Sequence, residues 1–466
     1  MNDVKNIIVE NGGTTQYVTE NKFDDWCRAV ETKNYRGIVT EKTYDVYGNV
    51  TEQRVTGGGL TMTESNTYAS GNYRTKSVNS DGSDTSFSYN ADGGLKSSTL
   101  PNGQANSYAY DSMGQVKSIA ALVKGVTNKN EISYQFGYVT QLKHGNTTYE
   151  FTYDGYGRVK TVKAGGTTIL TNTYTDFGTN LDGVAGAVSR VVSNDAVGNT
   201  VTAYADKYGR VIATKRNNDE PTKEVYDLAG NLTQHIDNEA GISYNYEYNE
   251  HDQVTEYTEK KGASTRVRMG CIYDMYERPK SSTYTVNGKS YSYTCGYVNN
   301  ASDELSSFAT PLGTVTYERD GLKRLKCKRL NTGSRSIENE YEYAANRSKS
   351  GYTSQLISVM QFRAGNARGT YTYSYDASGN ITSVGDGNKT LASYEYDGIG
   401  RLTRENINGE KTVVYGYDNA GNLTSKKEYA YTTGALGAVT ATHSYQYASG
   451  SWGDRLTFYN GQCIKY

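Results

Sequence analysis

The sequence predicts an all-β protein built as a repeat array of β-hairpins. Tyrosine accounts for 45 of the 466 residues, and it recurs in one phrase, Tyr-Asp-x-x-Gly-(Asn or Arg)-hydrophobic. Near the end of the chain the glycine of this phrase returns every 21 residues, at Gly379, Gly400 and Gly421. A fixed period of about 20 to 50 residues is typical of a repeat protein. No helical periodicity is long enough to compete, and its best stretch, residues 21–30, is short.

Six copies of the phrase are complete. Each supplies a tyrosine, an aspartate and a glycine to one repeat turn, and these are the candidate sites, with a structural role. They are Tyr44, Asp45 and Gly48; Tyr153, Asp154 and Gly157; Tyr226, Asp227 and Gly230; Tyr375, Asp376 and Gly379; Tyr396, Asp397 and Gly400; and Tyr417, Asp418 and Gly421.

The strands are predicted by tyrosines that alternate with polar residues ahead of the phrase, as at Tyr371, Tyr373 and Tyr375. Side chains two residues apart lie on the same face of a strand, and aromatic residues favour a pleated, half-buried surface. Each repeat therefore contains a strand with a tyrosine-rich face.

The phrase itself predicts the turn that follows this strand. Its aspartate suits the first position of a type I turn, where the carboxylate accepts hydrogen bonds from backbone N–H groups ahead. The glycine three residues later supplies a positive φ, as in a type I turn closed by a G1 bulge. The hydrophobic residue at the end of the phrase starts the return strand.

A second turn is predicted about half a period away. Asn102-Gly103, Asn287-Gly288 and Asn408-Gly409 are flanked by strand-like residues. Asn-Gly is the dipeptide preferred in a two-residue type I′ hairpin. One repeat is therefore predicted to hold two strands and two turns.

The array is predicted to extend over residues 42–466 in units of about 21 residues, after an atypical N-terminal segment at 1–41. The poorest match, around 326–370, predicts an irregular insertion. The last copy breaks off in mid-repeat at Tyr466, so we expect the array to be truncated there. No separate globular domain is expected, because each unit of a repeat array packs on its neighbours.

Composition narrows the function classes. Aromatic residues make up 12% of the chain and there are only 4 prolines, which argues against disorder. The 49 basic and 50 acidic residues are interspersed, so no basic stripe predicts nucleic-acid binding. We see no signal peptide and no apolar stretch of membrane-spanning length. The five cysteines share no short spacing, so neither a disulfide framework nor a zinc site is expected.

No catalytic or cofactor-binding constellation is predicted, and no metal site. The four histidines are scattered; His235 and His251 lie in neighbouring repeats and could approach each other across strands. Calcium loops stack several acidic residues within a few positions, whereas each repeat turn has one aspartate, so capping of the turn suffices. No Gly-x-Ser-x-Gly elbow has a partner histidine, and the Gly57–59 run lacks the lysine and helix of a phosphate loop.

The phrase, repeated at steps of about 21 residues, is similar to the YD repeat of RHS proteins. This family includes bacterial polymorphic toxins, the cocoon subunits of insecticidal toxin complexes and the animal teneurins. The resemblance covers about nine-tenths of the chain. It implies a spiralling sheet that forms part of a hollow RHS/YD barrel or shell.

The resemblance also implies a function. The chain would be a non-catalytic section of a shell that encapsulates or presents a C-terminal toxin in a secreted or surface bacterial protein. Its partner would be a toxin cargo encoded downstream or in trans. The alternative is a cell-surface adhesion module that binds glycans through its tyrosine-rich faces. The chain departs from shell-forming toxins in having no Asp-Pro dipeptide, no recognisable cleavage segment and no N-terminal delivery domain.

Overall fold

The computed structural model describes residues 6–11, 14–123, 126–298, 303–448 and 453–465. These residues form strands joined by turns and one short 3-10 helix, η1 (Leu181–Gly183), so the predicted all-β fold class is confirmed. Among the described residues, no helix is long and apolar enough to cross a membrane.

The strands form two sheets in which each strand pairs antiparallel with the next one along the chain. The first sheet holds β1 (Asn6–Asn11), β2 (Thr14–Phe23), β3 (Ala29–Asn34), β4 (Val39–Tyr44), β5 (Val50–Gly57), β6 (Leu60–Tyr68), β7 (Arg74–Val78), β8 (Asp84–Tyr89), β9 (Leu95–Thr99), β10 (Ala105–Tyr110), β11 (Val116–Val123), β12 (Val126–Gln135), β13 (Tyr138–His144), β14 (Thr147–Tyr153), β15 (Val159–Ala164), β16 (Thr167–Thr175), β17 (Ser189–Asp195), β18 (Thr200–Ala205) and β19 (Val211–Arg216).

The second sheet holds β20 (Lys223–Tyr226), β21 (Leu232–Asp237), β22 (Ile242–Tyr248), β23 (Val254–Lys261), β24 (Ser264–Tyr273), β25 (Pro279–Val286), β26 (Lys289–Tyr297), β27 (Leu305–Thr310), β28 (Gly313–Arg319), β29 (Leu325–Asn331), β30 (Ser336–Ala345), β31 (Thr353–Ala364), β32 (Ala367–Tyr375), β33 (Ile381–Gly385), β34 (Thr390–Tyr396), β35 (Leu402–Ile407), β36 (Lys411–Tyr417), β37 (Leu423–Ala430), β38 (Val439–Tyr447), β39 (Leu456–Tyr459) and β40 (Gln462–Cys463).

The break between the two sheets lies at the link from β19 to β20. Pro221 in this link has no N–H to donate to a strand ladder. The link is held instead by Thr222, whose backbone N–H donates to the Thr214 carbonyl at 2.8 Å and whose Oγ1 accepts from the Thr214 N–H at 3.0 Å. The ribbon therefore continues past the break.

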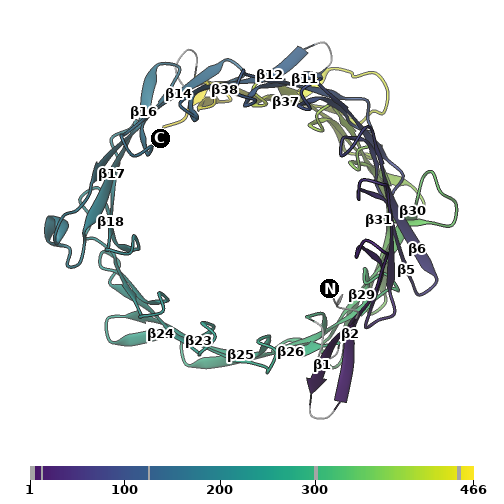
Figure 1. Cartoon of the computed structure of the whole chain (residues 1–466), viewed down its shortest axis with the longest axis horizontal. Coiled ribbons are helices and arrows are strands. Elements are labelled where there is room, and N and C mark those ends of the chain that lie inside the picture. The colour runs from purple at the N-terminus through teal and green to yellow at the C-terminus, as the bar shows by residue number, and fades with distance from the viewer. Residues whose placement is uncertain (1–5, 12–13, 124–125, 299–302, 449–452, 466) are drawn as a thin grey trace.

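The ribbon curves into a ring one layer thick and continues past its own start (Figure 1). The described residues between 6 and 298 form a first circuit, and those between 303 and 465 run alongside part of it as a second circuit (Figure 1). β31 contacts β6 where the two circuits meet. Hydrogen bonds between the circuits join residues 266 to 305 positions apart, which is the length of chain needed for one circuit.

Few side chains in this wall are fully buried, because a single layer has no second sheet to cover it. The buried hydrophobic cluster consists of Ala187, Tyr204 and Ala213, packed near η1. Most wall residues are half-buried. The ring is therefore held together by its ladders, its turns and contacts between neighbouring repeats rather than by one central core.

Residues 21–30, the best helical candidate in the sequence, contain no helix. They form the end of β2, a tight turn and the start of β3. Asp24 accepts hydrogen bonds from the N–H groups of Trp26 and Arg28 at 3.0 Å, and Cys27 takes the positive φ of 62° where the phrase has glycine. This turn has the geometry of the repeat turns, although it precedes the predicted array; the boundary at residue 41 stays a prediction.

The second turns match the type I′ prediction at one place of three. Asn287 and Gly288 both have positive φ, 50° and 76°, as this turn type requires. At Asn102-Gly103 and Asn408-Gly409 only the glycine does, so the type I′ prediction is wrong there. At Gly103 the loop is longer than two residues: the Gly103 N–H donates to the Leu100 carbonyl, and the Leu100 N–H donates to the Gln104 carbonyl.

The stretch around 326–370 is crossed by β29, β30, β31 and β32, which pair one after another. Its irregularity lies in the turn between β30 and β31 and in the adjoining end of this strand pair, where the register shifts twice, between Glu342 and Tyr343 and between Tyr343 and Ala345. There the Asn346 N–H donates to the Tyr352 carbonyl, six residues on, whereas the Asp45 N–H donates to the Asn49 carbonyl, four residues on. The turn is longer by two residues and lacks the phrase.

Candidate functional site: repeat turns and the seam between circuits

The aspartate of each complete phrase binds the N–H groups of its own turn. Asp45 shows the pattern: its Oδ1 accepts from the N–H groups of Tyr47 and Asn49 at 2.9 Å, and its Oδ2 accepts from Asn49 Nδ2 at 2.9 Å. The hydrogen bond from the Asn49 side chain lowers the pKa of Asp45, with help from the backbone N–H groups. Both oxygens of the carboxylate thus accept hydrogen bonds from groups of the same turn.

The glycine of the phrase closes a type I turn with a bulge. The Gly48 N–H donates to the Asp45 carbonyl at 3.2 Å, Gly48 has a φ of 89°, and the strand register shifts between Thr43 and Tyr44. The same shift occurs at the tyrosine of the other five complete copies. The glycines of those copies, Gly157, Gly230, Gly379, Gly400 and Gly421, also have positive φ.

The tyrosine of the phrase connects neighbouring repeats through its hydroxyl. The Tyr396 hydroxyl donates to the carbonyl of Ile381 at 2.9 Å, and the Tyr417 hydroxyl donates to the carbonyl of Leu402 at 2.9 Å. The accepting residue is the one that ends the preceding phrase. The tyrosines of the other complete copies make the same bond: Tyr44 to Ala29, Tyr153 to Val139, Tyr226 to Val211 and Tyr375 to Ile357.

Sequence reasoning assigned these tyrosines to a strand face and missed the bond. A signal for it exists in the sequence. The tyrosine follows the hydrophobic residue of the preceding phrase by 15 residues, both from Ile381 to Tyr396 and from Leu402 to Tyr417. The offset is 15 residues in four of the six complete copies, 14 at Tyr153 and 18 at Tyr375. An offset that recurs between two fixed positions of successive repeats points to a contact between them.

The Asn or Arg of the phrase also reaches the next repeat. Arg401 donates from Nε to Asp397 at 2.6 Å, its guanidinium stacks 4.8 Å from the Tyr417 ring centre, and its Nη1 donates to the Asp418 carbonyl at 3.2 Å. A stacking of this kind contributes about 0.5–1 kcal/mol at an exposed site. Asparagine is a shorter connector; Asn49 Nδ2 donates to the Gly71 carbonyl at 3.0 Å.

These turns define two different rims of the ring. Because consecutive strands are antiparallel, turns that follow even-numbered strands lie at one rim, here called the phrase rim since all six complete phrases fall there. Turns that follow odd-numbered strands form the opposite rim.

The seam is the line where the phrase rim of the second circuit rests on the opposite rim of the first. Asn346, which is buried, donates from Nδ2 to the Ser80 carbonyl at 2.7 Å, and the Arg347 N–H donates to the Asp81 carbonyl at 2.8 Å. Five contacts follow the seam in order: Tyr35 with Glu304, Gly57 with Gly321, Ser80 with Asn346, Asn102 with Gly398, and His144 with Ala420.

Glycine allows the closest approach within the seam. A Cβ built on Gly57 would overlap the carbonyl oxygen of Gly321, and one on Gly58 would lie 2.7 Å from the Gly321 Cα. The Gly57–59 run, which the sequence excluded as a phosphate loop, therefore lets two backbones touch. Farther along, Asn146, Ala420 and Asp454 take part in lining a cavity of about 380 Å³ between the circuits.

A charged cluster holds the start of the seam. Glu304, only 15% exposed, lies 3.0 Å from Arg36 of the first circuit and 2.7 Å from Lys323, and it accepts from the Tyr35 hydroxyl at 2.6 Å. Burial works to raise the pKa of Glu304, but the bond to Lys323 and the hydroxyl of Tyr35 outweigh it, so that the pKa is lowered. The cluster keeps the carboxylate charged where the circuits meet.

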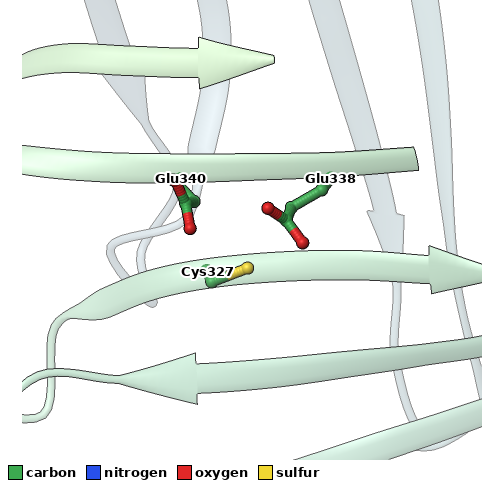
Figure 2. A group of neighbouring side chains, drawn as sticks. All are labelled: Cys327, Glu338 and Glu340. Atoms are coloured by element: carbon green, nitrogen blue, oxygen red, sulfur yellow. The ribbon is translucent and has the colours of Figure 1, made fainter. Parts of the chain in front are cut away.

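Among the described residues, one group of three side chains could hold a metal ion. It consists of Cys327 on β29 with Glu338 and Glu340 on β30 (Figure 2). The ligand atoms lie within 4.8 Å of one another. Both glutamates are already paired with arginines: Glu338 with Arg329, and Glu340 with Arg363 at 3.2 Å. Burial, followed by the charge of Glu338, raises the pKa of the Cys327 thiol. The group is an ion-pair network, and these pairings disfavour a metal ion.

The histidines serve separate local contacts. His235 lies 3.0 Å from Glu224, and His251 lies 3.3 Å from Glu277, so the predicted approach of the two histidines to each other is not what the structure shows. Within the described part of the chain, no histidine belongs to a group of three possible metal ligands. His144 lies in the seam, with Nε2 2.8 Å from the Ala420 carbonyl oxygen.

Comparison with known proteins agrees with this geometry. The RHS Repeat family model matches residues 226–264 and 375–411. A search of curated proteins finds no match. The fold is similar to the crystal structure of TcdB2-TccC3-TEV, with a TM-score of 0.69 and 12% identity over 95% of this chain and 27% of that chain. It is also similar to that of TcdB2-TccC3-Cdc42, with a TM-score of 0.60 and 11% identity over 96% of this chain and 25% of that one.

The chain thus spans about a quarter of the length of the chains it resembles. At this level of identity the likeness shows the fold, which is a structural wall of hairpins. The phrase turns, the matched repeats and the shared fold lead to one conclusion: the chain carries RHS repeats and has the hairpin-wall fold of the two similar crystal structures.

Proposed function

We propose that this chain is a non-catalytic section of an RHS shell that encloses or presents a toxin polypeptide. The observation that carries the proposal is the seam. A wall that meets its own earlier circuit, and is bonded to it at Asn346 and Glu304, separates an inside from an outside. Such a wall can protect a chain placed within it.

The non-catalytic part of the proposal is supported by how the reactive groups are used. The phrase aspartates bind their own turns, as Asp45 does. The two glutamates beside Cys327 are paired with arginines, and His144 lies in the seam. These carboxylates and this imidazole therefore take part in contacts that hold the wall together.

The partner we propose is a polypeptide cargo encoded downstream or in trans, within a secreted or surface protein of a bacterium. The names of the two similar crystal structures join TccC3 to a further component, TEV in one and Cdc42 in the other, which agrees with this choice. No observation favours glycan binding over the shell: the hydroxyls of the phrase tyrosines, such as Tyr396, are taken by backbone carbonyls.

The test begins with the reading frame on both sides of the chain. A frame that continues into further repeats and a short unrelated domain supplies a candidate cargo, which is then produced together with the shell and treated with a protease. We expect the cargo to survive while the same cargo alone is digested. Equal digestion in both cases would refute the proposal. Gly57→Val, which wedges the seam open, is expected to abolish protection; Gly270→Ala, at a site with open space, is the matched control.

A further inference from the structure

The phrase rim of the first circuit carries a row of exposed apolar side chains. They occupy the turns of this rim, mostly at the two variable positions of the phrase. The row consists of Trp26, Val46, Tyr47, Met113, Phe136, Tyr156, Phe177, Tyr208, Leu228 and Met275, each at least 65% exposed. Of the other large hydrophobic residues described, only Ile272 and Leu312 are 60% exposed or more.

The row is interrupted at the turns after β6, β8 and β22, which hold no large apolar side chain of comparable exposure. Exposed apolar groups gathered on one surface nevertheless mark an interaction site. Scattered apolar residues need no explanation, but here they share one rim and one kind of position. Formation of the turn does not require large apolar residues at the two variable positions. Small residues also occur there: Ala229 beside Leu228, and Ser112 beside Met113. The exposed apolar side chain at the tip of a turn, here called a phrase-rim tip, is therefore a property of this rim and not a requirement of turn formation.

The second circuit shows what covers such a tip. Leu322 stands at the second variable position of its turn, as Tyr47 and Tyr208 do in theirs. It is only 8% exposed, whereas Tyr47 and Tyr208 are 65% and 70% exposed. The difference arises at the seam, where the adjacent Gly321 rests on Gly57 of the first circuit. A phrase-rim tip is buried when the opposite rim of another circuit lies against it.

The opposite rim of the second circuit has the features of the covering surface. At the seam the opposite rim offers glycines that a neighbour approaches closely, such as Gly58 and Gly145; a Cβ on Gly145 would lie 2.7 Å from the Ala420 Cβ. On the second circuit the opposite rim offers Gly333, Gly365 and Gly409, each with nothing within 4 Å of a built Cβ. Both halves of a seam are thus exposed on one molecule.

We propose that the phrase rim of the first circuit binds the opposite rim of another RHS coil, and that for this chain in solution the occupant is a second copy stacked head to tail. The interface continues the seam already present within the chain. A head-to-tail contact uses two different surfaces. A stack therefore keeps one of these surfaces free at one end and the other surface free at the other end. The inference depends on the shell geometry and is independent of any cargo.

A recess on the phrase rim offers room for an incoming turn. A pocket of about 430 Å³ is lined by Trp26, Arg28, Tyr44 and the turn 45–48. Arg28 stacks on Trp26 at 5.0 Å and on Tyr44 at 4.6 Å, which leaves an apolar wall with one fixed cation. A glycine turn with outward carbonyls suits such a recess, as the Gly398 carbonyl suits Asn102 at the seam.

The experiment is sedimentation velocity of the full chain over a range of concentrations. We expect association that rises with concentration. The double variant Leu228→Asp with Met275→Asp is expected to weaken it by about tenfold or more, since central apolar contacts dominate an interface. Gly409→Asn, which fits a positive φ but fills the open rim, is expected to weaken it from the other side. Ile119→Asp, half-exposed in mid-strand on β11, is the control, with folding of all variants checked by circular dichroism.

A photo-crosslinker placed at position 228 identifies the contact. We expect cross-links between copies to peptides that contain Gly333, Gly365 or Gly409. A chain that stays monomeric up to its solubility limit would overturn the proposal, and so would association that the rim variants leave unchanged. Binding to phosphatidylcholine vesicles without cross-links between copies would assign the apolar rim to a membrane surface and overturn it as well. Protection of a cargo is a separate readout, so failure of either proposal is recognised independently.

Discussion

The hydroxyl of Tyr396 donates a hydrogen bond to the carbonyl oxygen of Ile381 at 2.9 Å and thereby joins two successive hairpins. The two residues belong to different copies of the phrase. The bond recurs along the array, so the tyrosine that names the repeat serves its neighbour as well as its own turn. Burial raises the pKa of Tyr396, which keeps the hydroxyl protonated as a donor.

Replacing Tyr396 with phenylalanine removes this bond and leaves the ring in place. We expect a loss of about 0.5–1.5 kcal/mol in local stability, because that is the usual net value of one hydrogen bond. In a repeat array the effect is local, so amide hydrogen exchange of β33 to β35 measures it better than a global melt. Tyr371→Phe is the control; its hydroxyl makes no hydrogen bond among the described residues, and we expect no change there.

Acid is expected to loosen the repeat turns. The pKa of Asp45 lies below its ordinary value of 3.8, so the charged form stabilises the folded turn above that pH, and the contribution is lost as the pH falls through the lowered pKa. The Asn249 turn is a natural control, because its Oδ1 accepts the same two backbone bonds at 3.0 Å without a carboxylate. Hydrogen-exchange protection below pH 4 is expected to fall at Asp45 and hold at Asn249. Equal loss at both turns would contradict this account.

The glycine contact in the seam is expected to tolerate no side chain. Gly57→Ala places a Cβ against the Gly321 carbonyl, and overpacking of this kind costs about 1–3 kcal/mol. The backbone of Gly57 does not need a positive φ, so the cost comes from the contact alone. Small-angle scattering is expected to show a wider ring, together with faster proteolysis near residue 321. Gly270→Ala has room for its methyl group and is expected to behave as the parent.

Removing the carboxylate of Glu304 is expected to push the circuits apart at the start of the seam. Arg36, Arg319 and Lys323 lie within 3.4 Å of it, so Glu304→Ala leaves three positive charges facing one another. Loss of one partner from a largely buried pair costs about 3 kcal/mol or more. Chemical denaturation measures the loss, and added salt is expected to recover part of it by screening. A variant as stable as the parent would show that this cluster does not hold the seam.

The cysteines are expected to differ widely in reactivity. Cys27 and Cys463 are exposed, whereas Cys327 is 2% exposed and burial raises the pKa of its thiol. A thiol reagent at pH 7 is therefore expected to modify the first two quickly and Cys327 slowly.

Titration with Cd²⁺ tests whether the group in Figure 2 binds a metal ion. No thiolate-to-metal absorption is expected from Cys327, because Arg329 and Arg363 are paired with the two neighbouring glutamates. Such absorption, lost in Cys327→Ser, would assign a metal site there.

The repeat turns could be predicted because their chemistry is local. Asp45, Gly48 and the residues between them contain all the groups that close the turn, so the phrase is sufficient. The same local reasoning failed at residues 21–30, where Cys27 takes the place of the phrase glycine and the spacing of Phe23 and Trp26 resembled a helix. A positive φ at a residue other than glycine leaves no mark in a sequence.

The seam could not be predicted, because it depends on curvature added up over many hairpins. Asn346 and Ser80 are 266 residues apart, and nothing near either residue indicates the other. A small change of twist per strand would move Asn346 onto a different turn of the first circuit. The bond of Tyr396 lies between these extremes, since its partner is one repeat away and the offset of 15 residues recurs in four of the six complete copies.

The number of residues needed for one circuit has a consequence for capacity. Each hairpin has a fixed width, so a circuit of 266 to 305 residues sets the circumference of the ring. Adding repeats lengthens the coil along its axis and leaves its diameter unchanged. The volume inside the coil therefore grows in simple proportion to the number of repeats, so duplication of hairpins enlarges it without any change to the design of a single hairpin.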